Sequence, residues 1–280
     1  MRNNQDRFSL GQQQSFSNPV AQVAQPTFNF ITPTELVELP SKGKYYPPEH
    51  PLHNKETVEI KHMTAKEEDI LTNKSFIEKG IVLDKLLESV FVDKQIDPSS
   101  LFVIDKNAIL LKSRITGYGS DYSAIVMCNT CGNKMQANVD LNNLLKIKEA
   151  ELPEGAVQEQ NGLVTVVLPI SKWKVSLKPL NGYDQLEMQK SFELRKKHNL
   201  EENILLETLK SFIFSINDIQ DPLSLQSAVV NMPARDSKYI RTIFAKCFPN
   251  ITSQINVSCS SCSTEIETEV PFSINFFWPD

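Results

Sequence analysis

The chain has 280 residues, of which 40% are hydrophobic and 22% are charged, and its formal net charge is −5. These values are ordinary for a soluble globular protein with one large domain or two small ones. The acidic balance argues against a nucleic-acid binder, because phosphate contacts need clustered Lys and Arg. No apolar run approaches the roughly 20 residues of a membrane span, and the N-terminus lacks the apolar core of a signal peptide. These features predict a cytosolic origin, in which the five cysteines indicate thiols or a metal site rather than disulfides.

The first two segments show little regular periodicity. Residues 1–30 are rich in Gln, Asn and Ser, which predicts a flexible arm. The alternative is an arm that orders against a partner. Residues 31–63 contain several prolines and Gly43, which predict an extended Pro-rich strap that ends in a short strand at 57–62.

Residues 64–121 carry the clearest helical pattern. Thr64 and Glu67 have the spacing of a capping box, in which each side chain satisfies a free amide of the first helical turn. Farther along, apolar residues recur at helical spacing from 81 to 90. Gly80 is expected to separate two helices. Asp105 is expected to begin another helix that ends near Gly119.

Residues 142–253 differ in character and are predicted to form an inserted α/β subdomain. The stretch 163–180 reads as two strands around a turn that contains proline. Residues 183–217 predict one or two amphipathic helices. Pro222 and Pro233 stand where first-turn prolines would open two more helices.

Two CxxC pairs flank this insertion, in "CNTCGNK" and "CSSCSTE". Each pair lies between two strand patterns, which predicts two β-hairpin knuckles at 122–141 and 254–280. Facing knuckles supply four thiolates, the ligand set of a closed tetrahedral zinc site. The sequence therefore predicts one structural Zn²⁺, and we expect the flanking strands to form one sheet. The predicted ligands are Cys128, Cys131, Cys259 and Cys262. The fifth cysteine, Cys247, is expected in the core.

Two other functions compete with a structural metal site. A thiol oxidoreductase would place its CxxC between a strand and a helix, whereas strand patterns follow both pairs here. A zinc-ribbon regulator would bind nucleic acid, but Glu265, Glu267 and Glu269 alternate along one strand and would repel phosphate. The sequence contains no GxxxxGK[ST], GxGxxG or GxSxG motif, and it predicts no catalytic residue and no enzyme.

Several short stretches occur in one order along the chain: "ELPSKGKYYP", "MTAKEEDIL", "GIVLDKLLESV", "GYGSDY" and "FFWPD". Together with the paired CxxC motifs, they resemble the baseplate hub and hub-assembly proteins of T-even-type contractile-tailed bacteriophages (myoviruses). The resemblance covers roughly residues 35–280. It implies a structural or assembly protein of the tail baseplate hub that contacts other phage baseplate or hub proteins. It also implies a location in the host bacterial cytoplasm during assembly or in the virion tail, with no bound nucleic acid and no membrane span.

The expected fold is α+β, with an N-terminal helical region and an inserted α/β subdomain joined by the split four-cysteine zinc ribbon. Exposed aromatic side chains would serve as anchors for a partner protein. Burial of the same side chains in the chain's own core is the alternative, and the sequence does not choose between the two. The candidate partner-binding residues are Lys42, Tyr45, Tyr46, Phe276, Phe277 and Trp278.

Overall fold

The strap begins with a β-hairpin rather than with a single strand. In the computed structural model, β1 (Thr34–Glu38) pairs antiparallel with β2 (Thr57–Lys61), and the sequence predicted only the second of them. The structure describes residues 31–159, 161–198, 203–270 and 272–278, so the predicted arm of residues 1–30 lies outside it. Residues 32–280 form one contact unit, which carries all the features below.

The helical region consists of α1 (Ala65–Thr72), α2 (Lys74–Glu78), α3 (Val82–Val90), the 3₁₀ turn η1 (Pro98–Ser100) and α4 (Val103–Tyr118). The predicted capping box is present, since the Thr64 amide donates to Glu67 Oε2 at 2.8 Å. Gly80 separates α2 from α3 at a φ of 66°, a left-handed conformation that glycine adopts without cost. The third long helix begins two residues before the predicted Asp105.

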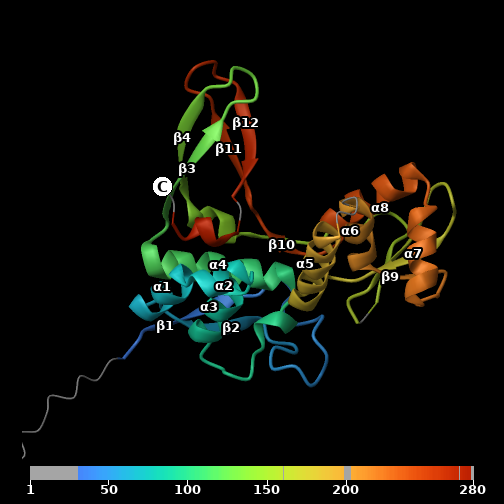
Figure 1. Ribbon diagram of the computed structural model, residues 1–280, viewed down its shortest axis with the longest axis horizontal. Helices are drawn as coiled ribbons and strands as arrows, with labels where there is room; N and C mark the ends of the chain where they lie inside the picture. The colour runs from blue at the N-terminus through green and yellow to red at the C-terminus, as the bar shows by residue number, and fades with distance from the viewer. Residues whose placement is uncertain (1–30, 160, 199–202, 271, 279–280) are drawn as a thin grey trace, which may run out of the picture. The chain divides into compact units, whose positions relative to one another are not determined.

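The cysteine pairs lie at the ends of two hairpins. The first hairpin joins β3 (Asp121–Met127) to β4 (Lys134–Asp140), followed by η2 (Leu141–Leu145). The second joins β11 (Gln254–Ser258) to β12 (Glu265–Glu269), followed by η3 (Ile274–Phe276). Figure 1 shows both hairpins extending from the helices to a common tip.

The two hairpins form separate two-stranded sheets, so the expectation of one shared sheet is wrong. The physical reason is that they meet through buried side chains rather than through strand edges. Val126 and Ala137 of the first hairpin share one small core with Ile266 of the second. Each hairpin therefore keeps its own hydrogen-bonded ladder and leaves its outer edges unpaired.

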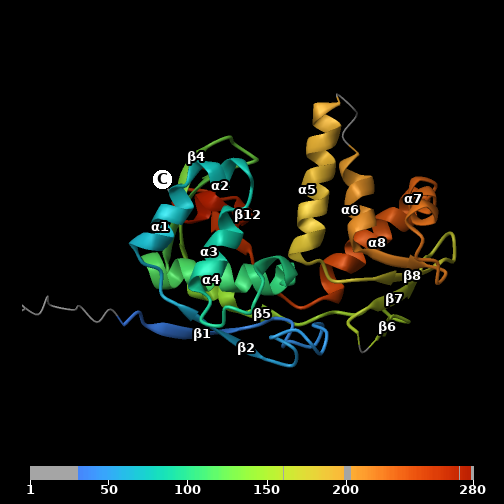
Figure 2. The same ribbon diagram turned by 60° about the horizontal axis from the view of Figure 1, so that its bottom comes forward.

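The region between the hairpins has its own sheet and core. Close to its two ends, β5 (Ile147–Lys148) pairs with β10 (Asn250–Ile251). Between them, the strands β6 (Val157–Gln158), β7 (Val164–Val167), β8 (Lys174–Leu177) and β9 (Ile213–Ile216) form an antiparallel sheet in that order. The helices of this region, labelled in Figure 2, are α5 (Gly182–Lys197), α6 (Ile204–Phe212), α7 (Pro222–Val230) and α8 (Ala234–Cys247).

Most local expectations for this region are confirmed, and one element was missed. β7 and β8 flank the predicted turn, and α7 begins at Pro222. Pro233 is the residue before α8 rather than its first residue. The stretch after α6 was expected to continue as helix, but it forms β9 instead, whose Ile213 and Ile216 are buried in the local core. An apolar run of this length is compatible with either a helix or a strand. Burial in the local core therefore determines that residues 213–216 form a strand.

A buried carboxylate fastens the strap to α4. Asp105 is 0% exposed and accepts three hydrogen bonds: from Ser41 N–H at 2.9 Å, from Ser41 Oγ at 2.6 Å and from Tyr46 Oη at 2.7 Å. Burial raises the pKa of Asp105, although these donors favour its charged form. The "SKGKYY" stretch thus acquires a structural role, because two of its side chains bind one helical carboxylate.

Gly43 lies at the turn of the same stretch, with a φ of 69°. A Cβ atom at this position would come within 2.4 Å of the carbonyl oxygen of Leu52, a backbone atom that cannot easily move. The Gly43 N–H donates to Ser41 Oγ at 3.0 Å, so the turn also orients the hydroxyl that reaches Asp105. Glycine is the residue that both adopts this positive φ without strain and fits beside the Leu52 carbonyl.

We predict that Asp105→Ala lowers the free energy of unfolding by roughly 3 kcal/mol, because three buried donors lose their acceptor. Asp105→Asn should cost less, since the amide oxygen still accepts and the two hydroxyls can rotate to accept from the NH₂ group. Urea unfolding followed by circular dichroism measures both losses. Asp69→Ala, which removes an exposed carboxylate from α1, serves as the control and should change stability by less than about 0.5 kcal/mol. Equal effects of Asp105→Ala and the control would refute the role of Asp105.

Candidate metal centre

The two knuckle turns are built in the same way. In the first, Cys128 N–H donates to the carbonyl of Asn133 at 2.8 Å, and Gly132 N–H donates to the carbonyl of Cys128 at 2.8 Å. In the second, Cys259 N–H donates to Thr264 at 2.9 Å, and Ser263 N–H donates to Cys259 at 2.9 Å. Because the bonds repeat at the same offsets, both turns present their two sulfurs in the same way.

The residue after each CxxC adopts a left-handed conformation. Gly132 has a φ of 72°, and Ser263 has a φ of 56° at the equivalent position. Glycine adopts this conformation without strain, whereas a residue with a Cβ atom pays roughly 1–2 kcal/mol. The second knuckle therefore carries backbone strain at Ser263 that the first knuckle avoids at Gly132.

All four predicted ligands come together. Cys128 Sγ lies 3.7 Å from Cys262 Sγ, and Cys131 Sγ lies 3.7 Å from Cys259 Sγ. All four sulfurs lie within 4.8 Å of one another. A tetrahedron with metal–sulfur bonds of ~2.3 Å has sulfurs ~3.8 Å apart, whereas a disulfide brings them to ~2.05 Å. The geometry fits one tetrahedral metal ion held by four thiolates, two from each hairpin.

The polypeptide supplies donors that favour thiolates at this centre. The hydroxyl and the backbone amide of Thr264 lower the pKa of Cys262 to about 6. Backbone amides of Cys131 and Thr130 lower the pKa of Cys128. For Cys131, the amide of Asn133 favours the thiolate, but the neighbouring sulfurs oppose it and raise the pKa to about 11. A bound cation would remove that opposition, since it attracts all four negative sulfurs.

Burial is shared evenly between the two knuckles. Cys128 is 1% exposed and Cys259 is 2% exposed, whereas Cys131 and Cys262 are exposed. The first cysteine of each pair thus faces the small core between the hairpins, and the second faces solvent. Cys247, by contrast, lies in the core of the inserted region, where burial raises its thiol pKa to about 12. Its expected role as a core residue is confirmed.

Three of the aromatic candidates for partner binding are buried in the chain's own core. Tyr46 is 2% exposed, Phe276 is 0% exposed and Phe277 is 1% exposed. Arg114 holds the terminal turn in place, because its Nε donates to the carbonyl of Phe276 at 3.3 Å. These three side chains are not available as surface anchors in this structure, because they fill the space around α4 instead.

The other three candidates reach the surface. Lys42 pairs with Glu149 at 2.8 Å, and Tyr45 packs edge-on against Phe248 with ring centres 6.1 Å apart. Trp278 is 38% exposed and packs against Tyr118. Partner contacts through Lys42, Tyr45 and Trp278 stay a prediction. Two supporting roles carried no clear signal in the sequence: Asp105 was expected to begin a helix rather than to bind the strap, and Thr264 was not expected to support a cysteine.

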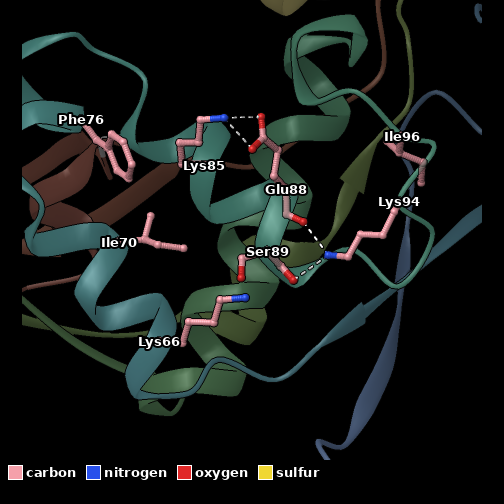
Figure 3. Close-up of a pocket in the computed structure, with 8 residues that line it drawn as sticks. All are labelled: Lys66, Ile70, Phe76, Lys85, Glu88, Ser89, Lys94 and Ile96. Atoms are coloured by element: carbon pink, nitrogen blue, oxygen red, sulfur yellow. Dashed lines mark hydrogen bonds and ion pairs between the residues drawn. The ribbon is translucent and has the colours of Figure 1, made fainter.

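A hollow of about 560 Å³ lies between α1, α2 and α3. Figure 3 shows that its cations are largely engaged within the chain: Lys85 binds Glu88, and Lys94 donates to the carbonyl oxygens of Glu88 and Ser89. Lys94 thus caps the C-terminus of α3, which is a structural role. The lining contains no histidine or cysteine and has the residues Lys66, Ile70, Phe76, Lys85, Glu88, Ser89, Lys94 and Ile96.

We predict that Cys128→Ser and Cys259→Ser each abolish metal binding, because one missing thiolate opens the tetrahedral site. Protein produced with zinc should hold about one ion per chain, and each variant should hold close to none. Stability should fall by at least about 3 kcal/mol, since metal binding is coupled to folding of the knuckles. Elemental analysis and thiol titration before and after denaturation in chelator measure both effects. Cys247→Ala is the matched control and should keep its metal; metal retained by the ligand variants would contradict the site.

Ser263→Gly should strengthen the centre, because glycine relieves the left-handed strain of the second knuckle. A gain of about 0.5 kcal/mol corresponds to a roughly twofold higher apparent metal affinity. Competition with a chromophoric chelator measures this change. Ser261→Gly lies in the same turn without a positive φ and should give no gain. Equal affinities of the two variants would show that the strain at residue 263 has no effect on the centre.

The described residues contain no helix that is both long and apolar enough to cross a membrane. Searches of curated proteins and of solved structures each returned no match. The model of one protein family, described as T4 bacteriophage base plate protein, matches residues 32–278. This match spans the strap, the helices, both cysteine hairpins and the insertion between them. The chain therefore belongs to the T4 bacteriophage base plate protein family.

Proposed function

We propose that this protein is a structural or assembly protein of the tail baseplate hub, held together by one structural zinc ion. The observation that carries the proposal is the four-thiol centre, which lies inside the region matched by the baseplate family. Family membership supports a structural baseplate role. The assignment to the hub rests on the resemblance of "LPSKGKYYP" and "FFWPD" to hub proteins.

Zinc is the ion that best suits the ligand set. Four cysteines at tetrahedral spacing are typical of structural zinc, and soft thiolates disfavour magnesium or calcium. Cys128, Cys131, Cys259 and Cys262 would hold the ion, and the amides and hydroxyl near them would support their negative charge. Because four protein ligands leave no open coordination position, such an ion stabilises the fold and does no chemistry. We therefore propose a non-enzymatic role.

The two alternatives receive less support. A thiol oxidoreductase needs a dithiol pair within one CxxC, but the 3.7 Å sulfur contacts join Cys128 to Cys262 and Cys131 to Cys259, across the hairpins. Strands β4 and β12, rather than helices, follow the two pairs. A nucleic-acid role is disfavoured because the three glutamates of β12 are all exposed and would repel phosphate.

The partners in this proposal are other phage baseplate or hub proteins, met in the host bacterial cytoplasm during assembly. A phage in which the gene for this chain is inactivated should yield few complete baseplates, as counted by electron microscopy of lysates. A plasmid with the wild-type gene or with Cys247→Ala should restore them, whereas Cys128→Ser should not. Mass spectrometry of purified virions distinguishes a permanent component from an assembly factor. Normal baseplates in the absence of the protein would refute the proposal.

A further inference from the structure

A groove of about 420 Å³ runs beside the first cysteine hairpin. All five residues from 122 to 126 of β3 line it, with Thr268 and Glu269 of β12 and with Trp278 near the C-terminus. Successive residues of a strand point to opposite faces, so a cavity that touches all five must lie along the strand's edge. The only unpaired edge of β3 is the one away from β4. The groove therefore exposes the backbone of β3.

The hydrogen bonds at the two ends of the hairpin show which backbone groups face the groove. Leu141 N–H donates to Ser120, and Cys128 N–H donates to Asn133, so residues 120 and 128 belong to hydrogen-bonded pairs. In an antiparallel ladder these pairs alternate with pairs whose backbone groups point away from the partner strand. The N–H and C=O groups of Ser123 and Ile125 thus point into the groove, where no described residue bonds them.

Among the four hairpin strands, β3 alone presents exposed, large apolar side chains on its outward face. Ile125 is 71% exposed and Met127 is 56% exposed. The outward positions of β12 carry Glu265, Glu267 and Glu269, and those of β4 and β11 are polar or charged. Charged or polar outer positions protect strand edges from pairing with other chains. The second half of β3, at Ile125 and Met127, lacks this protection.

We propose that this groove binds an extended, cationic and partly apolar strand of a partner polypeptide, which adds to the edge of β3. The occupant would bond the free groups of Ser123 and Ile125 and cover Ile125 and Trp278 with apolar side chains. Its positive charge follows from the groove, whose lining includes Glu269 and no Lys or Arg. The exposed carboxylates of Asp121 in β3 and Glu267 in β12 belong to the strands that line the groove and add to the negative charge. This proposal rests on the assembly role proposed above and gives that role a contact surface.

Proline substitutions give a matched test of strand addition. Ser123→Pro removes an N–H that points into the groove and leaves the β3–β4 ladder intact, as proline at a sheet edge allows. Asn138→Pro removes the equivalent outward N–H on β4, which lies directly opposite residue 123. Both variants lose the same hydrogen bond between Ser123 Oγ and Asn138 Oδ1. Only the first variant blocks the proposed edge.

The probe is an acetylated and amidated hexapeptide that alternates lysine with valine, carries a fluorophore and is titrated with the zinc-loaded full chain. We expect saturable binding that Ser123→Pro weakens about tenfold and Asn138→Pro leaves nearly unchanged. The glutamate–valine peptide should bind more weakly than the lysine–valine peptide. Amide signals of Ser123 and Ile125 should shift in ¹⁵N NMR spectra of the wild-type protein.

Three results would overturn the proposal: no binding, equal weakening by both proline variants, or binding that survives Ser123→Pro. Concentration-dependent self-association in sedimentation, lost in Ser123→Pro alone, would assign the edge to a second copy and also overturn it. Unchanged metal content in both variants shows that the knuckles still fold. The peptide assay needs no phage, so its failure is distinct from a failure of the complementation experiment.

Discussion

The requirement that four thiols meet in one small tetrahedron constrains the path of the whole chain. The sulfurs that come closest belong to residues 134 and 128 positions apart. The chain must therefore leave the first hairpin, build the inserted region and return to the same place. The β5–β10 pair closes the insertion near its two ends, so the metal centre is not the only closure. Because closure entropy grows slowly with loop length, such an insertion can be large at little extra cost.

A second constraint acts on the opposite side of the helical region, where Asp105 holds the strap. The β1–β2 ladder pairs only the two ends of the strap, and the proline-containing loop between them forms no strand. The three hydrogen bonds from Ser41 and Tyr46 fix the intervening loop to α4. Tyr46 also buries its ring in the main core, so the same residue contributes apolar and polar contacts. The carboxylate of Asp105 and the left-handed turn at Gly43 therefore both hold the shape of this loop.

Features that depend on local chemistry could be predicted from the sequence, and features that depend on tertiary packing could not. The capping box of Thr64 and Glu67 and the paired cysteines each involve residues close in sequence and of specific chemistry. The strand β9 follows α6 without a break, and its apolar run carried no signal to separate the two. Whether Phe276 and Phe277 face a partner or the core depended on the space beside α4, which no local pattern describes. The separation of the hairpins into two sheets likewise depended on how their inner faces pack.

That separation links the metal centre to the open edge of β3. Four ligands shared equally by two turns hold the hairpins face to face, because each turn must direct both sulfurs toward the other. An edge-to-edge arrangement would have paired β3 with a strand of the second hairpin and consumed its free backbone groups. The same geometry that gathers the four sulfurs leaves an unpaired strand beside Trp278. A four-thiol site at the tip and an available strand edge along the side are two consequences of one arrangement.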